Sequence, residues 1–278
     1  MSEFARTVYN FNDRLKLNDV TTDPTKYVLV DSSAFLDTIA QNVEETRTTE
    51  MGIVDYGTHI GKGTAKIPVV LYADSEAKMN GLIQTFKSAF DPDALEADPT
   101  YGEATGKEGY VPLKWTEVVD STSRDFQIFL KSVEVPRVAM DTMAGVIRGS
   151  MLLLKAQDPR KYLQAQSNLA GAGTASNVGL TTTPVEITIV ASGATSTSLT
   201  ITNSTRSESI VISTTLSAGQ TLVIDTRLHS VKLNGVEHRE YLASSSIWML
   251  LSPGNNTIAL ANNSNCTVTT KWYSAWAL

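Results

Sequence analysis

The stretch SIWMLLSPGNNTIAL, Ser246 to Leu260, indicates how the second half of this chain folds. Two apolar runs are separated by Ser-Pro-Gly-Asn-Asn, and Pro-Gly is a turn dipeptide whose glycine tolerates a positive φ. This pattern predicts two β-strands joined at a corner, with Pro253, Gly254 and Asn255 as the turn residues. Asn234 and Gly235 predict a second corner of the same kind between two other strands.

The rest of the second half has the same character. Short apolar segments recur at regular spacing, with Gly, Asn or Ser between them, which is typical of a β-sandwich of jelly-roll type. The expected strands cover residues 185–190, 198–203, 209–214, 221–226, 229–235, 246–251, 256–260 and 266–273.

The first half mixes strands with one helix. Met79, Leu82, Ile83, Phe86 and Phe90 recur at spacings of three and four, which predicts an amphipathic helix over residues 75–90 that packs on a sheet. Alternating or apolar segments predict strands at residues 26–31, 66–73, 110–115, 125–135 and 145–156. The fold class is therefore mainly β, with a helix-bearing sandwich or barrel followed by a second sandwich.

The composition changes between these halves. Residues 166–184 are rich in Gly, Ala, Ser and Thr and contain no charge, so we expect a linker there. The expected domains are residues 1–165 and 185–278.

A long acidic segment, residues 91–109, follows the predicted helix. A loop of this length in a compact domain is usually functional or mobile. It is either an arm that reaches another subunit or an ordinary surface loop. The candidate contact residues are Asp91, Asp93, Glu96, Asp98 and Tyr101.

Charge is distributed unevenly along the chain. Residues 1–165 hold 18 Lys and Arg against 24 Asp and Glu, whereas the remaining residues hold five of each, and the net charge is −6. Neutralising phosphates requires clustered Lys and Arg, so nucleic-acid binding through a basic surface is excluded.

The amino terminus lacks a signal-peptide pattern, and no apolar run is long enough for a membrane span, so we expect synthesis in the cytoplasm.

No pattern of a catalytic or metal site is present. The histidines His59, His229 and His238 do not form a pair with metal-ligand spacing, and the single Cys266 can form neither an internal disulfide nor a thiolate metal site by itself. We therefore expect no catalytic, metal or cofactor-binding residues and no cofactor. A hydrolase would need two converging carboxylates or a triad, and an enzyme is the third-ranked interpretation.

The aromatic residues near the carboxy terminus allow two interpretations. Trp248, Trp272 and Trp276 belong to the last predicted strands. Exposed, they would form a platform for a sugar ring, as in carbohydrate-binding modules. Buried, they would be part of the sandwich core.

Two segments of the chain resemble one known family. TLVIDTRLHSVKLNGVEH (221–238), followed by SSIWMLLSPGNNTIAL (245–260), resembles the carboxy-terminal signature of the distal tail proteins of long, flexible-tailed phages. The matching residues are Ile224, Asp225, Val231, Asn234, Gly235, Trp248, Leu250, Pro253, Gly254, Asn255 and Ile258. GSMLLLKAQDPRKYL (149–163) is similar to the family's domain junction, with Asp158, Pro159 and Tyr162 as the matching residues.

The resemblance implies a structural virion protein at the distal end of the tail. Its amino-terminal domains would close a six-fold ring around the channel through which genomic DNA leaves without specific binding. Its galectin-like carboxy-terminal sandwiches would project outwards. The partners would be the tail tube protein, the tail-tip hub protein and, in many phages, receptor-binding proteins. A carbohydrate-binding module for host cell-wall glycans is the alternative.

Overall fold

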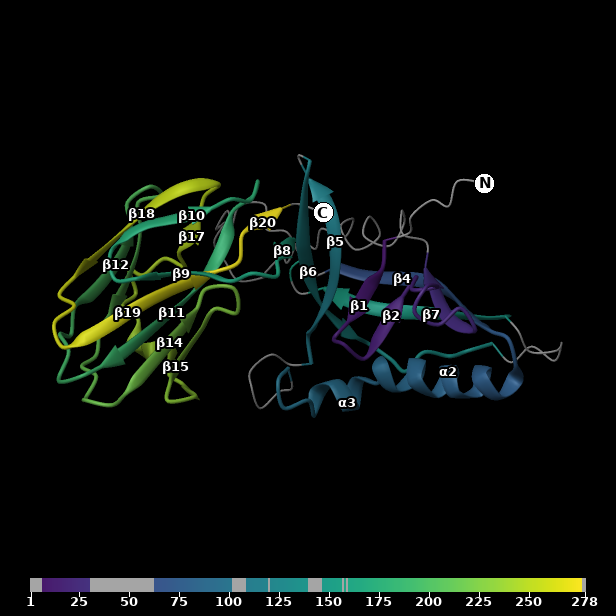
Figure 1. Cartoon of the computed structure of the whole chain (residues 1–278). Helices are drawn as coiled ribbons and strands as arrows, with labels where there is room; N and C mark the ends of the chain where they lie inside the picture. Colours follow the sequence, from purple (N-terminus) through teal and green to yellow (C-terminus); the bar gives the residue numbers. More distant parts are fainter. Residues whose placement is uncertain are drawn as a thin grey trace, which may run out of the picture. The chain divides into compact units, whose positions relative to one another are not determined.

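The computed structural model describes residues 7–30, 63–101, 109–119, 121–139, 147–156, 158 and 160–276. The chain divides into two units, Met1–Lys161 and Tyr162–Ala277. The fold is mainly β in both, which confirms the predicted fold class (Figure 1).

Seven strands of the first unit form a closed barrel. Hydrogen-bonded neighbours follow the order β6-β5-β1-β2-β3-β4-β7, and β6 also pairs with β7, which closes the ring of strands. Every pairing except β2 with β3 is antiparallel. The strands are β1 (Tyr9–Phe11), β2 (Leu15–Leu17), β3 (Lys26–Val30), β4 (Gly63–Ala73), β5 (Val111–Val119), β6 (Thr122–Ser132) and β7 (Ile147–Ala156).

Helix α2 (Glu76–Ala89) packs its apolar side on the inward side of the barrel. Met79, Leu82 and Phe86 are buried, and the ring of Phe90, just after the helix, lies 4.3 Å from that of Phe11 in β1. A second, short helix, α3 (Pro92–Glu96), follows in the segment 91–109, which the sequence predicted to be either an arm or a surface loop. Figure 1 shows α2 and α3 running one after the other along one side of the strands of this unit.

The second unit is a sandwich of two antiparallel sheets. One sheet has the order β10-β18-β12-β13, and the other has the order β16-β15-β14-β11-β19-β9 with β17 paired to β11. Alternating residues of both sheets point inwards and form one apolar core, which includes Ile187, Ile201, Ile224, Ile258 and Trp272.

The bounds of its strands agree with most of the predicted segments. They are β8 (Lys161–Leu163), which begins at the division between the units, β9 (Ser167–Ala170), β10 (Gly173–Asn177), β11 (Thr183–Ala191), β12 (Leu199–Asn203), β13 (Glu208–Ile212), β14 (Thr221–Asp225), β15 (Ser230–Leu233), β16 (Val236–Glu237), β17 (Leu250–Leu251), β18 (Gly254–Ala261), β19 (Cys266–Trp272) and β20 (Ala275–Trp276), with a 3-10 helix η2 (Arg239–Tyr241).

Two of the sequence-based expectations for this half are wrong. Residues 166–184 are not a linker, because β9 pairs with β19 and β10 pairs with β18, so both belong to the sandwich. The predicted strand 246–251 is a strand only at Leu250–Leu251. The residues before it make single backbone hydrogen bonds to β13, such as Ala243 N to Val211 O and Ile247 N to Ser209 O.

Candidate interaction surfaces

The Asn234-Gly235 corner is a two-residue hairpin turn between β15 and β16. Leu233 pairs with Val236, and the two residues between them have φ values of 49° and 89°. Positive φ at both central positions is the requirement of a type I′ turn, which Asn-Gly meets at little steric cost. The Asn234 side chain also accepts a hydrogen bond from Thr221 N at 3.0 Å, which ties the turn to β14.

The corner Pro253-Gly254-Asn255 connects β17 to β18. Gly254 has φ 85°, so its backbone conformation favours glycine, although a Cβ atom there would meet no atom within 4 Å. Asn255 is exposed on the surface. The corner is instead fixed by the next residue, Asn256, which the sequence reasoning missed.

Asn256 is fully buried, and its side-chain amide is hydrogen-bonded on both sides. Its Oδ1 accepts from Ser252 N at 2.9 Å and from Asn203 Nδ2 at 3.2 Å. Its Nδ2 donates to the carbonyl oxygens of Ser252 at 2.9 Å and Gly254 at 3.1 Å. One signal could have identified it: Asn256 lies two residues before Ile258, and therefore on the inward face of the strand.

Two of the three tryptophans proposed as a sugar platform are core residues. Trp272 and Trp276 are each 4% exposed, and Trp272 Nε1 donates to Ser176 O at 3.1 Å. The platform interpretation is therefore wrong for both.

Trp248 is half-buried and belongs to a small aromatic and cationic cluster. Its ring stacks on that of His229, with centroids 4.8 Å apart and planes 15° apart, and the Arg239 guanidinium lies 5.6 Å from its centroid. His238 stacks on Tyr241 and lies 2.8 Å from Glu240 Oε1, a hydrogen bond that lowers the pKa of Glu240. Trp248 is the one residue of the predicted platform that remains at the surface.

The described part of the acidic segment is attached to its own barrel. Leu95 of α3 is fully buried, Glu96 forms an ion pair with Lys131, and Asp98 forms one with Arg14. Burial alone would raise the pKa of Asp98, but hydrogen bonds from Thr100 N, Tyr101 N and Arg14 together lower it.

The remaining arm candidates lie at the start of the same segment or at its described end. Asp91 is the N-cap of α3 and accepts from the backbone N–H of Asp93, whereas the Asp93 carboxylate has no ion-pair partner among the described residues. Tyr101 O accepts from Gly109 N at 2.7 Å, so the two described ends lie beside one another. Residues 102–108 lie outside the described part, and whether the segment reaches a neighbour remains a prediction.

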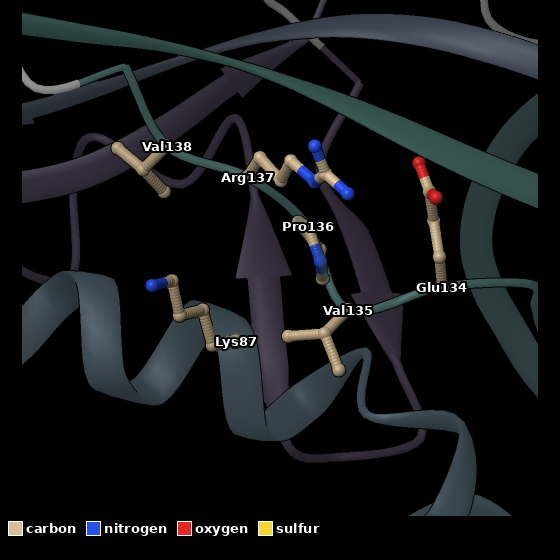
Figure 2. A pocket seen from close by; sticks show the side chains of 6 residues that line it. All are labelled: Lys87, Glu134, Val135, Pro136, Arg137 and Val138. Carbon is tan, nitrogen blue, oxygen red and sulfur yellow. The ribbon is translucent and has the colours of Figure 1, made fainter.

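An open hollow of about 540 Å³ lies beside α2 (Figure 2). It is lined by Lys87 of the helix and by residues 134–138, which follow β6 and run along β7. Its wall combines two cations and a carboxylate with the apolar Val135, Pro136 and Val138.

Neither unit shows a chemical centre in its described residues. Cys266 is partly buried, which raises the pKa of its thiol, and its Sγ lies 3.4 Å from Asn263 O. No three His, Cys, Asp or Glu residues among those described come together as metal ligands would. In the same part of the chain, no helix combines the length and apolarity that crossing a membrane requires.

Comparison with known proteins gives one family. Residues 178–276, which include most of the sandwich, match the model of the family described as siphovirus-type tail component, C-terminal domain. A similar solved structure is that of SPP1 Dit (gp 19.1), described as a paradigm of hub adsorption apparatus in phages that infect Gram-positive hosts. The two chains are 16% identical with a TM-score of 0.49, over 83% of this chain and 85% of that one. No curated protein matches the sequence. The resemblance to distal tail proteins is thus supported by the family match, and residues 178–276 carry the siphovirus-type tail component C-terminal domain.

Proposed function

We propose that this chain is a ring-forming adaptor at the distal end of a phage tail. Six copies would close a ring around the DNA channel, join the tail tube to the tail-tip hub, and in some virions carry receptor-binding proteins at the rim. The observation that carries the proposal is the family match of residues 178–276, since that family consists of siphovirus-type tail components.

The charge distribution supports this role for the first unit. The whole negative excess of the chain lies in residues 1–165, with 24 acidic against 18 basic residues. A channel that lets DNA slide must not hold phosphates, and an acidic wall repels them, whereas clustered Lys and Arg would bind them. An adaptor of this kind needs no catalytic site, and we infer that the chain is not an enzyme.

The alternative, a carbohydrate-binding module, now depends on Trp248. Its half-buried ring is the one tryptophan of the predicted platform at the surface, and sugar-binding modules use such rings. A glycan array with the wild type and the Trp248→Ala variant tests this function. Binding that disappears in the variant would favour it over the adaptor.

The test of the adaptor is the state of the purified full chain. Negative-stain microscopy should show rings with a central hole, and mass photometry should give a species of about 181 kDa, six times the 30.1 kDa chain. Addition of the tail tube protein or the hub protein should produce a larger complex. A monomer that binds neither protein would contradict the proposal.

A further inference from the structure

The outward face of β3, β4 and β7 is an exposed apolar surface. The strand register arranges its residues in rows across the three strands. The first row is Tyr27, Tyr72 and Ile147, the second is Leu29, Val70 and Gly149, and the third is Pro68 and Met151. These residues alternate with the buried Val28, Ile67, Val69, Leu71 and Leu152. We call the following nine residues the outer apolar face: Tyr27, Leu29, Pro68, Val70, Tyr72, Ile147, Gly149, Met151 and Leu153.

The side chains of this face are accessible to a partner. Val70 is 40% exposed, Met151 48% and Ile147 62%, and the Tyr27 and Tyr72 rings stack at 4.6 Å across the two strands. An outward residue of a sheet covers about 33 Å², because strands lie about 4.8 Å apart and same-face residues repeat about every 6.8 Å. Nine residues thus cover about 300 Å², a patch size that often marks an interaction site.

Unpaired positive charge lies at one end of the face. Lys66, which pairs in register with Leu153, and Lys155, two residues further along β7, point to the same side as the face. Neither lysine forms an ion pair in the described part of the chain. A partner should therefore bring an apolar or shallow surface with carboxylates near its edge.

The opposite side of the same layer offers such a surface. Helix α2 contacts β3 and β4 on their inward side, so its exposed side faces away from the outer apolar face. We call α2, α3 and residues 134–138 the helical side. It carries the hollow of Figure 2, with Val135 43% exposed. Its carboxylates without an ion pair among the described residues are Glu76, Asp91, Asp93 and Glu134, against the cations Lys87 and Arg137.

We propose that the outer apolar face of one copy binds the helical side of the next copy of this chain. The inference rests on the proposed ring, because a closed cyclic assembly needs two different, complementary faces on each subunit. The apolar patch would be the core of the contact, and the two lysines with the opposing carboxylates its rim. At about 300 Å² the patch supplies under half of the roughly 800 Å² per partner that a stable interface buries, so the rim and the helices must supply the rest.

Single lysine substitutions test the face directly. Ile147→Lys and Met151→Lys place a charge within the outer apolar face, and we expect each to remove the 181 kDa species at a concentration where the wild type is fully assembled. Val118→Lys is the control, because Val118 is 69% exposed on β5, outside the face. All three sites are exposed, so the melting temperature of the monomer should be unchanged.

A mixing experiment tests that the two faces are different. A helical-side variant carrying Gln84→Lys and Ser88→Lys, both exposed on α2, should also fail to form rings. Mixed with Met151→Lys it should form dimers of about 60 kDa, because each variant keeps the face that the other lacks. Absence of this mixed dimer, or dimers within either variant alone, would contradict the proposal.

The outcomes separate the two proposals. A wild-type ring that survives both Ile147→Lys and Met151→Lys overturns the assignment of the face and leaves the adaptor role intact. A wild type that stays monomeric, alone and with tail partners, counts against both.

Discussion

The side chain of Asn256 should be the main support of the Pro253-Gly254 corner, and Asn256→Ala tests this. In the variant, Ser252 N loses its acceptor and one proton of the Asn203 amide loses its partner, while the carbonyls of Ser252 and Gly254 each lose a donor. Asn255→Ala is the matched control. It removes the same chemical group one residue away, from a side chain that is exposed.

The magnitude follows from the buried groups that are left without partners. A buried donor or acceptor without a hydrogen bond costs about 1–3 kcal/mol. Two donors are affected, so we expect Asn256→Ala to lower the free energy of unfolding of the second unit by about 3 kcal/mol. With an m-value of about 2 kcal/mol per M urea, the midpoint should fall by about 1.5 M. Asn255→Ala should change the free energy by less than about 0.5 kcal/mol.

The assay must report on the second unit alone, because the chain has two units. Urea unfolding read by pulsed hydrogen exchange and mass spectrometry separates peptides of residues 162–276 from those of the barrel. Equal midpoint shifts for the two variants would refute the reasoning. So would an Asn256→Ala shift confined to barrel peptides.

Three further predictions use the same readout. Gly179→Ala should destabilise the sandwich by about 3 kcal/mol or more, because the added Cβ would lie 2.0 Å from Ala275 O. Gly254→Ala meets no such clash, so it should cost only about 1–2 kcal/mol, the penalty of placing an alanine at a φ of 85°. Thr226→Val keeps the shape of a buried residue but removes its hydroxyl, which accepts from Val185 N and donates to Val185 O. It should lower the free energy of unfolding by about 2 kcal/mol, and a loss below about 0.5 kcal/mol would show that water replaces the hydroxyl. The pKa of Asp98 is lowered in the folded barrel. Its stabilising contribution is therefore present above the unfolded pKa and is lost as pH falls through the folded pKa. In a pH series, the difference in unfolding free energy between wild type and Asp98→Asn should vanish in acid.

Much of the strand pattern could be predicted because alternation reports which face is buried. The segments 185–190, 221–226 and 266–273 correspond to β11, β14 and β19, in which alternate residues are buried and most of these buried residues, though not Thr270, are apolar. The same rule could have placed Trp272 in the core, since it lies four residues after Val268 on the inward face of β19.

The strands that the sequence did not reveal lack apolar alternation. β1 and β2 have three residues each, too few to show a period. β9 and β10 consist of Ser, Asn, Ala, Gly and Thr apart from the single Leu169, and they are held by backbone pairing to β19 and β18, which leaves no alternating pattern in side-chain hydropathy. The opposite error occurred at residues 246–249, which form no strand ladder although an apolar run predicted one: Met249 is fully buried, whereas Ile247 is 51% exposed.

The site predictions were limited for a different reason. Asn-Gly and Pro-Gly are turn dipeptides that favour positive φ, so the turn positions Asn234, Gly235 and Gly254 could be predicted from the dipeptides alone. Whether an aromatic or an acidic side chain is exposed depends on contacts far away in the sequence. Asp98 shows this, because its partner Arg14 lies 84 residues earlier in the chain.

The segment Ser246–Leu260 contributes to the folding of the sandwich. β17 has only two residues, yet three buried asparagines hold the chain around it: Asn203 Nδ2 donates to Leu250 O at 2.8 Å, Asn177 Nδ2 lies 3.5 Å from Leu251 O, and Asn256 bonds to both backbone groups of Ser252. Amide side chains thus supply the hydrogen bonds that a longer strand ladder would supply, and Met249 and Leu251 can enter the core from a short segment. A family signature made of such residues identifies the sandwich but does not show where the chain contacts other proteins. Contacts of the chain should be sought where apolar groups and charges without an ion pair among the described residues are exposed. The barrel offers both on the outward face of β3, β4 and β7.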